Sequence, residues 1–176
     1  MKQTLFIVGA RGAGKTTIGK LLAEALSYKF IDTDESVQAT SKMTIADLVE
    51  QHGWKYFRKL ESQILKMVSQ SKHIVSTGGG MVLSSENRDY MRQHGVVIYL
   101  QAPANILINR LSLTPENSQR PSLTGKSILE EIEEVLAERE PLYCECADFI
   151  VDASLATEDI VNDIKSYILN QKNKII

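Results

Sequence analysis

Cysteine and histidine are scarce in this chain of 176 residues, and neither forms a recognisable cluster. The two cysteines, Cys144 and Cys146, are one residue apart, so they cannot cross-link distant segments, and no other Cys or His cluster lies nearby to complete a metal site. The three histidines, His52, His73 and His94, have no spacing that is typical of metal ligands or of a catalytic triad. We therefore expect reduced thiols, and histidines on the surface or in loops.

Long apolar runs and a strong net charge are also missing. No run approaches the roughly 18 residues that are needed to span a bilayer, and the apolar run at residues 5–8 is too short for a signal peptide. The net charge is -2 and the pI is about 5.9, which gives no electrostatic reason to expect nucleic-acid binding. These absences predict a cytoplasmic protein with no membrane or nucleic-acid partner, and a monomer as the default.

Short apolar runs alternate with longer helical patterns along the chain. The alternation predicts one α/β domain, residues 1–176, in which helices cover both faces of a parallel sheet. In such folds ligands bind at the carboxyl ends of the strands. The expected strands are 5–8, 30–31, 74–76, 96–100 and 149–151. The expected helices are 16–27, one that Thr44 opens as its N-cap, 61–68, 87–93, 104–111, 127–140 and 157–169.

Residues 9–16 read GARGAGKT and match the phosphate-loop pattern G-x-x-x-x-G-K followed by Ser or Thr. The loop lies between a predicted strand and a predicted helix, where its backbone N–H groups and the helix N-terminus can bind phosphate. Lys15 can neutralise the β- and γ-phosphates, and the Thr16 hydroxyl can ligate Mg²⁺. The alternative is a glycine-rich turn without a ligand.

A phosphate loop alone is compatible with a GTPase or a regulatory NTPase. The chain has no Asn-Lys-x-Asp guanine motif, since its only Asn-Lys pair, Asn173-Lys174, runs into the last two residues. It also lacks an apolar run that ends in Asp-Glu, as mechanical ATPases have. These absences favour a small-molecule kinase that uses ATP and Mg²⁺.

Polar residues follow the next two strands. Successive strand residues point to opposite faces, so Asp32 and Asp34, at the end of the second strand, are expected to project to the same side. One could hold Mg²⁺ and the other could accept a proton from an attacking hydroxyl. Alternatively, Asp34 caps a helix. Residues 77–80 read TGGG, which suits a ligand that approaches the main chain closely, or else a flexible turn.

Four arginines are candidates for binding anions, although most arginines in proteins are solvated surface residues. Arg58 lies in an amphipathic setting, and Arg139 lies among glutamates that could form simple ion pairs with it. Arg120 lies in the polar segment 112–127, which contains prolines and reads as a surface excursion. Arg110 ends a predicted helix.

Together these elements resemble the shikimate kinase family, in the nucleoside-monophosphate-kinase-like branch of P-loop proteins, over nearly the whole chain. The resemblance rests on residues 9–19, on FIDTD at 30–34, on Phe57-Arg58, on TGGG at 77–80, on RPSLTG at 120–125, and on Glu138-Arg139 with Leu142-Tyr143. It implies a three-layer P-loop fold with a five-stranded parallel sheet, a lid near 112–126 and a substrate-binding region near 34–61. It also implies transfer of the ATP γ-phosphoryl to the 3-hydroxyl of shikimate, in aromatic amino-acid biosynthesis.

The resemblance further implies a role for each site residue. Asp34 would bind shikimate and act as the base, with Lys15 and Arg120 as the other catalytic residues, and Thr16 and Asp32 would hold Mg²⁺. The residues that would bind ATP are Gly12, Ala13, Gly14, Lys15, Thr16, Thr17, Arg110 and Arg120. Those that would bind shikimate are Asp34, Arg58, Gly79, Gly80 and Arg139.

Three alternatives stay open at this point. Asp32 and Asp34 could partly exchange roles, because both follow the same strand. The acceptor could be another small polyol such as gluconate, since kinases of this kind share the loop and the fold. The chain could also be a nucleotide-dependent binding module without catalysis, although the two aspartates argue against that hypothesis.

Overall fold

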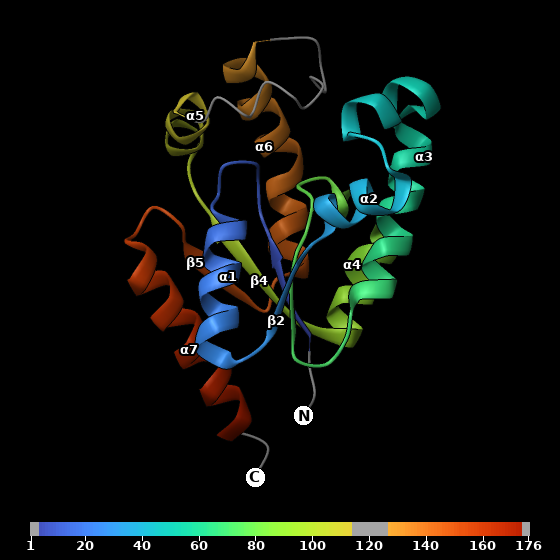
Figure 1. Cartoon of the computed structure of the whole chain (residues 1–176). Helices are drawn as coiled ribbons and strands as arrows, with labels where there is room; N and C mark the ends of the chain where they lie inside the picture. Colours follow the sequence, from blue (N-terminus) through green and yellow to red (C-terminus); the bar gives the residue numbers. More distant parts are fainter. Residues whose placement is uncertain (1–3, 114–126, 174–176) are drawn as a thin grey trace.

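A parallel sheet of five strands forms the centre of the computed structural model, which describes residues 4–113 and 127–173 (Figure 1). The strands are β1 (Thr4–Val8), β2 (Lys29–Asp32), β3 (His73–Ser76), β4 (Gly95–Gln101) and β5 (Phe149–Asp152). Their order across the sheet is β2-β3-β1-β4-β5, and every neighbouring pair is parallel. The predicted fold class and all five predicted strands are confirmed.

Helices connect the strands and cover the sheet. They are α1 (Lys15–Leu26), α2 (Thr33–Ser41), α3 (Ile45–Val68), the 3-10 turn η1 (Met81–Leu83), α4 (Ser85–His94), α5 (Ala104–Ser112), α6 (Ile128–Cys146) and α7 (Thr157–Asn173). Within the described ranges, none of them combines the length and the apolar composition that crossing a bilayer requires.

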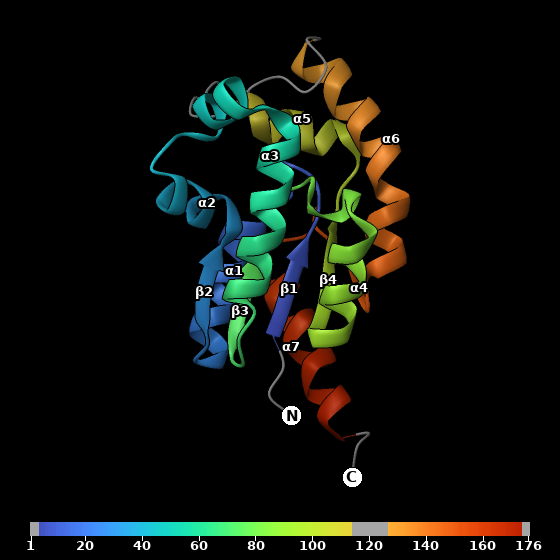
Figure 2. The ribbon, with the colours of Figure 1, turned by 90° about the vertical axis from the view of Figure 1, so that its right-hand side faces the viewer.

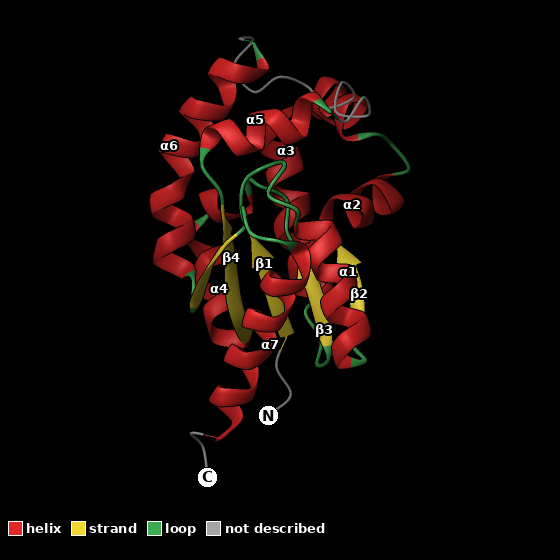
Figure 3. Ribbon diagram, turned by 90° about the vertical axis from the view of Figure 1, so that its left-hand side faces the viewer, coloured by secondary structure: helices red, strands yellow, loops and turns green. Residues whose placement is uncertain are grey.

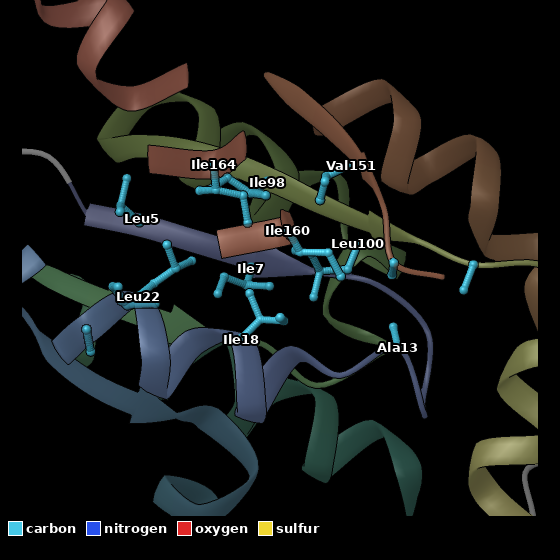
Figure 4. Packing of buried hydrophobic residues seen from close by; sticks show 14 of the residues in the cluster. Leu5, Ile7, Ala13, Ile18, Leu22, Ile98, Leu100, Val151, Ile160 and Ile164 are labelled. Atoms are coloured by element: carbon cyan, nitrogen blue, oxygen red, sulfur yellow. The ribbon is translucent and has the colours of Figure 1, made fainter. Parts of the chain in front are cut away.

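Successive side chains of β1 point to opposite faces of the sheet, where they join two separate layers of the core. Leu5 and Ile7 point to the face that α1 and α7 cover, and Figure 4 shows them packed with Ile18, Leu22 and Ile164. The intervening side chains of β1 belong to a second cluster with residues of α3, α4 and α6. Figure 2 views the molecule with α3 and α4 in front of the sheet, and Figure 3 views it with α1 and α7 in front. Because both faces are covered, β1 is buried along its whole length.

The segment after β2 forms a small apolar cluster of its own. Its buried members come from α2 and α3: Val37, Ile45, Leu48, Phe57 and Ile64. The Thr44 side chain caps α3 by accepting from the Asp47 N–H at 3.1 Å, as predicted. At Gly53 the backbone leaves the helical conformation (φ 79°), so α3 bends there and its first turns fold over α2. This part of the chain includes the predicted substrate-binding region, 34–61.

Two predictions about the elements were wrong in detail. The strand β2 ends at Asp32 and α2 begins at Thr33, so Asp32 and Asp34 do not share one face of an extended strand. The helix that was expected to end at residue 140 continues through Pro141 to Cys146. Burial of Tyr143 and Cys146 against the sheet explains the extension, because tertiary packing outweighs the backbone hydrogen bond that proline removes.

Candidate active site

The phosphate loop has the backbone conformation that its glycines permit. Gly12 and Gly14 have φ of 83° and 92°, in the left-handed region that residues with a Cβ rarely adopt. Gly14 is also the N-cap of α1, and it offers no side chain to the first-turn N–H groups. Those groups are therefore available to an anion at the positive end of the helix dipole. Thr17 is exposed in the same first turn.

Lys15 lies folded over the loop that precedes it. Its Nζ donates to the carbonyl oxygens of Gly9 at 2.9 Å and Ala10 at 2.8 Å. These bonds hold the ammonium group at the mouth of the loop, where a nucleotide phosphate could replace or join the carbonyls as its acceptor.

Arg110 connects the phosphate loop to the end of the sheet. Its Nη1 lies 3.4 Å from the carbonyl oxygens of Gly12 and Ala13, and its Nη2 donates to the Ala153 carbonyl at 2.6 Å. Arg110 therefore lies on the loop and beside the segment that follows β5. This position is compatible with the predicted binding of ATP.

The two carboxylate oxygens of Asp32 have different hydrogen-bond partners. Oδ1 accepts from the N–H groups of Asp34 at 2.9 Å and Glu35 at 3.3 Å, so Asp32 is the N-cap of α2. Oδ2 accepts from the Thr16 hydroxyl at 3.1 Å. The prediction that Asp34 could be a cap was wrong, because the N-cap of α2 is Asp32, two residues earlier. Asp34 lies instead in the first turn of α2, largely buried, with 9% of its surface exposed.

The oxygens of Thr16 and Asp32 match the donors that Mg²⁺ prefers. The ion usually takes one or two protein oxygens and completes its shell with water and substrate phosphates. No group of three or more His, Cys, Asp or Glu side chains that could hold a metal occurs in residues 4–113 and 127–173. A hydroxyl and a carboxylate beside the phosphate loop therefore fit an ion that arrives with a nucleotide.

The glycine turn, residues 77–80, is held by hydrogen bonds from several elements. The Gly78 N–H donates to the Thr33 hydroxyl at 2.9 Å, and Tyr143 Oη donates to the Gly79 carbonyl at 2.6 Å. The carbonyls of Gly78 and Gly80 accept from η1 at 3.0 and 3.1 Å. Among the residues that the structure describes, the N–H groups of Gly79 and Gly80 have no acceptor. The turn is therefore ordered, and it presents two adjacent backbone donors.

Two of the glycines are required by neighbouring side chains of the protein itself. A Cβ on Gly78 would lie 2.7 Å from Glu61 Oε1 and 2.8 Å from Asp34 Oδ1, so both carboxylates lie against this residue. A Cβ on Gly80 would overlap the guanidinium of Arg58. At Gly79 the nearest atoms would be 3.5–3.7 Å away, which is ordinary van der Waals contact. Gly79 is thus a glycine of the turn at which a Cβ would fit without a clash.

Arg58 is fixed on α3 by an ion pair and by two aromatic rings. Its Nη1 pairs with Oε2 of Glu61, one helical turn further along. Its Cζ lies 5.3 Å from the ring centroid of Trp54 and 5.2 Å from that of Phe57, within cation–π range. The guanidinium is therefore oriented before any ligand binds.

Glu61 is almost fully buried, with 1% of its surface exposed. Burial raises the pKa of its carboxyl group, and the positive charges of Arg58 and Arg139 partly offset that increase. Removing this carboxylate would leave Arg58 without its partner, so Glu61 controls the position of a cation beside the glycine turn.

Arg139 reaches the same turn from α6. It is 7% exposed, and its Nη1 lies 3.7 Å from the position of a Cβ on Gly79. Its Nε is buried and has no hydrogen-bond acceptor in the described part of the chain. A buried, unsatisfied guanidinium N–H is costly, and an anionic ligand at Gly79 would remove that cost.

The structure brings most of the predicted site residues together at the carboxyl ends of β1, β2 and β3. Arg120 and nearly all of the predicted lid, 112–126, lie outside the described residues. Sequence reasoning did not single out Thr33, Glu61 or Tyr143 as individual site residues. Only Glu61 had a signal of its own, because it lies three residues after Arg58 in a helical pattern.

The model of the shikimate kinase family matches residues 11–169 of the chain. "Shikimate kinase 2" from Photorhabdus laumondii is 66% identical over 165 residues, covering 94% of this chain and 95% of the relative. "Shikimate kinase 2" from Yersinia enterocolitica is 55% identical over 174 residues, covering 99% of this chain and 100% of the relative.

Solved structures give the same result. A shikimate kinase from Acinetobacter baumannii in complex with shikimate superimposes with a TM-score of 0.90 at 31% identity, covering 98% of this chain and 96% of the other. A gluconokinase from Sinorhizobium meliloti superimposes with a TM-score of 0.61 at 16% identity, covering 99% of this chain and 95% of the other. The second likeness shows the fold alone.

Proposed function

The chain belongs to the shikimate kinase family, and from that membership we propose that its site transfers the γ-phosphoryl group of ATP to the 3-hydroxyl of shikimate. The chain is a kinase that phosphorylates shikimate with ATP, a reaction of aromatic amino-acid biosynthesis. The 3-hydroxyl, the roles of single residues, Mg²⁺ and the expectation of a cytoplasmic monomer are the parts that we propose.

One observation carries the proposal about the acceptor. The guanidinium groups of Arg58 and Arg139 both reach the glycine turn, where the N–H groups of Gly79 and Gly80 have no acceptor in the described chain. Two planar cations and two backbone donors form a site for an anion, and arginine suits a carboxylate because its fork pairs with both oxygens. The carboxylate of shikimate is the anion that we assign to them.

Asp34 is the group that we assign to the reacting hydroxyl. Its carboxylate lies against Gly78, in the turn that would hold the acceptor, and Asp34 is two residues beyond Asp32, which ends β2 and caps α2. A carboxylate in hydrogen-bond reach of a hydroxyl can orient it and accept its proton as the phosphoryl group arrives. Glu61 lies against the same glycine, and its carboxylate forms an ion pair with Arg58.

The donor side follows from the phosphate loop. We assign the phosphates of ATP to the loop, Gly12 to Thr17, and to Lys15, with Arg110 towards the base. Mg²⁺ would be held by Thr16 and Asp32 and would neutralise charge on the β- and γ-phosphates. Arg120 would stabilise charge on the transferring group, a role that rests on the family resemblance because the residue lies outside the described ranges.

Product analysis tests the assignment of the hydroxyl. The purified protein is incubated with ATP, MgCl₂ and shikimate, and the product is examined by ³¹P and ¹H NMR. Phosphorus coupling to the proton on carbon 3 is the expected result. Coupling to the proton on another ring carbon would overturn the proposal for the acceptor atom while leaving the kinase activity intact.

A further inference from the structure

Tyr143 lies beside two of the residues that the proposed function assigns to the carboxylate of shikimate, Gly79 and Arg139. It lies on α6, 1% exposed, and its hydroxyl donates to the carbonyl oxygen of Gly79 at 2.6 Å. The guanidinium of Arg139, one helical turn earlier on α6, lies beside it, because a Cβ on Gly79 would be 3.5 Å from the Tyr143 hydroxyl and 3.7 Å from Arg139 Nη1. Tyr143 thus joins the glycine turn to one of the two arginines.

The chemistry of the phenol fixes the direction of its bond to the turn. A tyrosine hydroxyl has one proton and accepts through its lone pairs, whereas a guanidinium can only donate. The proton of Tyr143 goes to the Gly79 carbonyl, so towards the neighbouring guanidinium of Arg139 the phenol oxygen can act only as an acceptor. The Nε of Arg139 has no acceptor among the described residues.

The bond to the carbonyl also orients the next backbone donor. The Gly79 carbonyl and the Gly80 N–H belong to one planar trans peptide unit, so they point in opposite directions. Holding the carbonyl towards α6 therefore directs the Gly80 N–H away from α6. A glycine turn without this bond could rotate the peptide unit, because glycine places little restriction on φ and ψ.

The ring of Tyr143 is held in turn by the core. It stacks on the ring of Tyr99 with centroids 5.0 Å apart and an interplanar angle of 26°, and both side chains are fully buried. Burial raises the pKa of Tyr143 to about 12, so the hydroxyl keeps its proton throughout the neutral range. The Tyr143 hydroxyl can therefore donate to the Gly79 carbonyl at any pH near neutrality.

We propose that Tyr143 is a positioning residue for acceptor binding: its hydroxyl holds the Gly79–Gly80 peptide and the Arg139 guanidinium in the relative placement that binds the carboxylate of shikimate. This inference rests on the proposed function. Tyr143 contacts neither ATP nor the reacting hydroxyl in this account, so its removal should affect acceptor binding rather than the chemical step.

The test compares Tyr143→Phe with Tyr99→Phe. Each variant loses one buried hydroxyl from the same stacked pair, but the Tyr99 hydroxyl points to Glu140 at 3.5 Å and does not contact the glycine turn. For Tyr143→Phe we expect the KM for shikimate to rise about tenfold, because the carboxylate-binding groups lose their placement, with kcat and the ATP KM within about twofold. Tyr99→Phe should leave the KM for shikimate unchanged.

A substrate without the carboxylate charge shows whether Tyr143 positions the groups that bind the carboxylate or only keeps the whole substrate site ordered. The methyl ester of shikimate cannot form the ion pair with Arg139, so Tyr143→Phe should change its KM less than about twofold. An equal penalty for shikimate and the ester, an equal effect of both Phe variants, or no effect of Tyr143→Phe would each overturn the inference. Failure of the wild-type protein to bind shikimate would instead overturn the proposed function.

Discussion

Glu61 and Arg58 form an ion pair one helical turn apart on α3, and each of them occupies the space beside a different glycine of the 77–80 turn. Glu61 lies against Gly78 and Arg58 against Gly80. The pair therefore couples the orientation of a substrate-binding cation to a buried carboxylate. Burial of this carboxylate also affects the stability of the folded protein.

We expect Glu61 to make the stability of the protein depend on pH in a particular direction. Burial raises the pKa of this carboxyl group above its ordinary value of 4.5, so the folded protein binds its proton more tightly than the unfolded chain does. Its contribution to stability is therefore greatest below the ordinary pKa and decreases as the pH rises through the raised pKa. Glu61→Gln has no such proton, so the difference between the two proteins isolates the effect.

Urea unfolding of wild type and Glu61→Gln between pH 4 and pH 8 measures that difference. Relative to the variant, the wild type should lose about 1.4 kcal/mol of unfolding free energy for each tenfold difference in proton affinity between its folded and unfolded states. A difference that stays constant, or that moves the other way with pH, would show that Glu61 is not destabilised by its burial.

The space around Gly79 predicts a variant that folds but does not bind the acceptor. A Cβ at this position would meet only ordinary contacts, so Gly79→Ala should keep its melting temperature within a few degrees. The added methyl group would lie 3.7 Å from Arg139 Nη1, one of the groups assigned to the carboxylate, and the KM for shikimate should rise at least about tenfold. Gly78→Ala is the contrast, because its Cβ would press on two buried carboxylates and should also lower stability.

The outcome is read by thermal unfolding and by initial rates at varied shikimate with ATP held constant. Normal shikimate kinetics in Gly79→Ala would mean that the acceptor does not approach this glycine. A large loss of stability in Gly79→Ala would mean instead that the turn itself requires glycine there.

Asp34 should be essential for turnover and dispensable for binding ATP. Asp34→Asn keeps the shape of the side chain but cannot take up the proton of the attacking hydroxyl, so kcat should fall by about 10²- to 10⁴-fold. The affinity for ATP, measured by calorimetry without shikimate, should be unchanged, since the nucleotide is assigned to the phosphate loop. Turnover near that of wild type would remove Asp34 from the role of base.

Two substitutions of Asp32 should separate its roles as helix cap and as metal ligand. Asparagine caps helices about as well as aspartate, so Asp32→Asn should remain stable while it requires more Mg²⁺ for half-maximal activity. Asp32→Ala loses the bonds to the Asp34 and Glu35 N–H groups and should also lose about 1 kcal/mol of stability. Equal Mg²⁺ requirements in wild type and Asp32→Asn would contradict the assignment of Asp32 to the metal.

The features that the sequence revealed have a local cause. The phosphate loop could be recognised because its glycines, Lys15 and Thr16 must lie close together in the sequence to surround a phosphate. The strands could be predicted because a strand in a parallel sheet that is covered on both faces is a continuous run of apolar residues. The arrangement of strand ends then follows from the fold, so Asp32 and Gly78 could be assigned to one edge of the sheet before their geometry was known.

The features that the sequence did not reveal depend on contacts between distant segments. Nothing in the residues around Asp32 distinguishes a continued strand from a capped helix until Val37 finds its place in the α2–α3 cluster. Thr33 meets Gly78 across 45 positions of sequence, and Tyr143 meets Gly79 across 64. Such long-range pairs leave no pattern in a single sequence, although they decide how the glycine turn is oriented.

The most direct test of the central claim is the initial rate of ADP release from ATP in the presence of shikimate, quinate or gluconate, each at the same concentration with MgCl₂. All three acceptors carry a carboxylate and hydroxyl groups, so charge alone does not separate them. We expect shikimate to stimulate ADP release far above the rate without acceptor and above the rates with quinate and gluconate. Stimulation by gluconate in preference to shikimate, or by none of the three, would contradict this expectation.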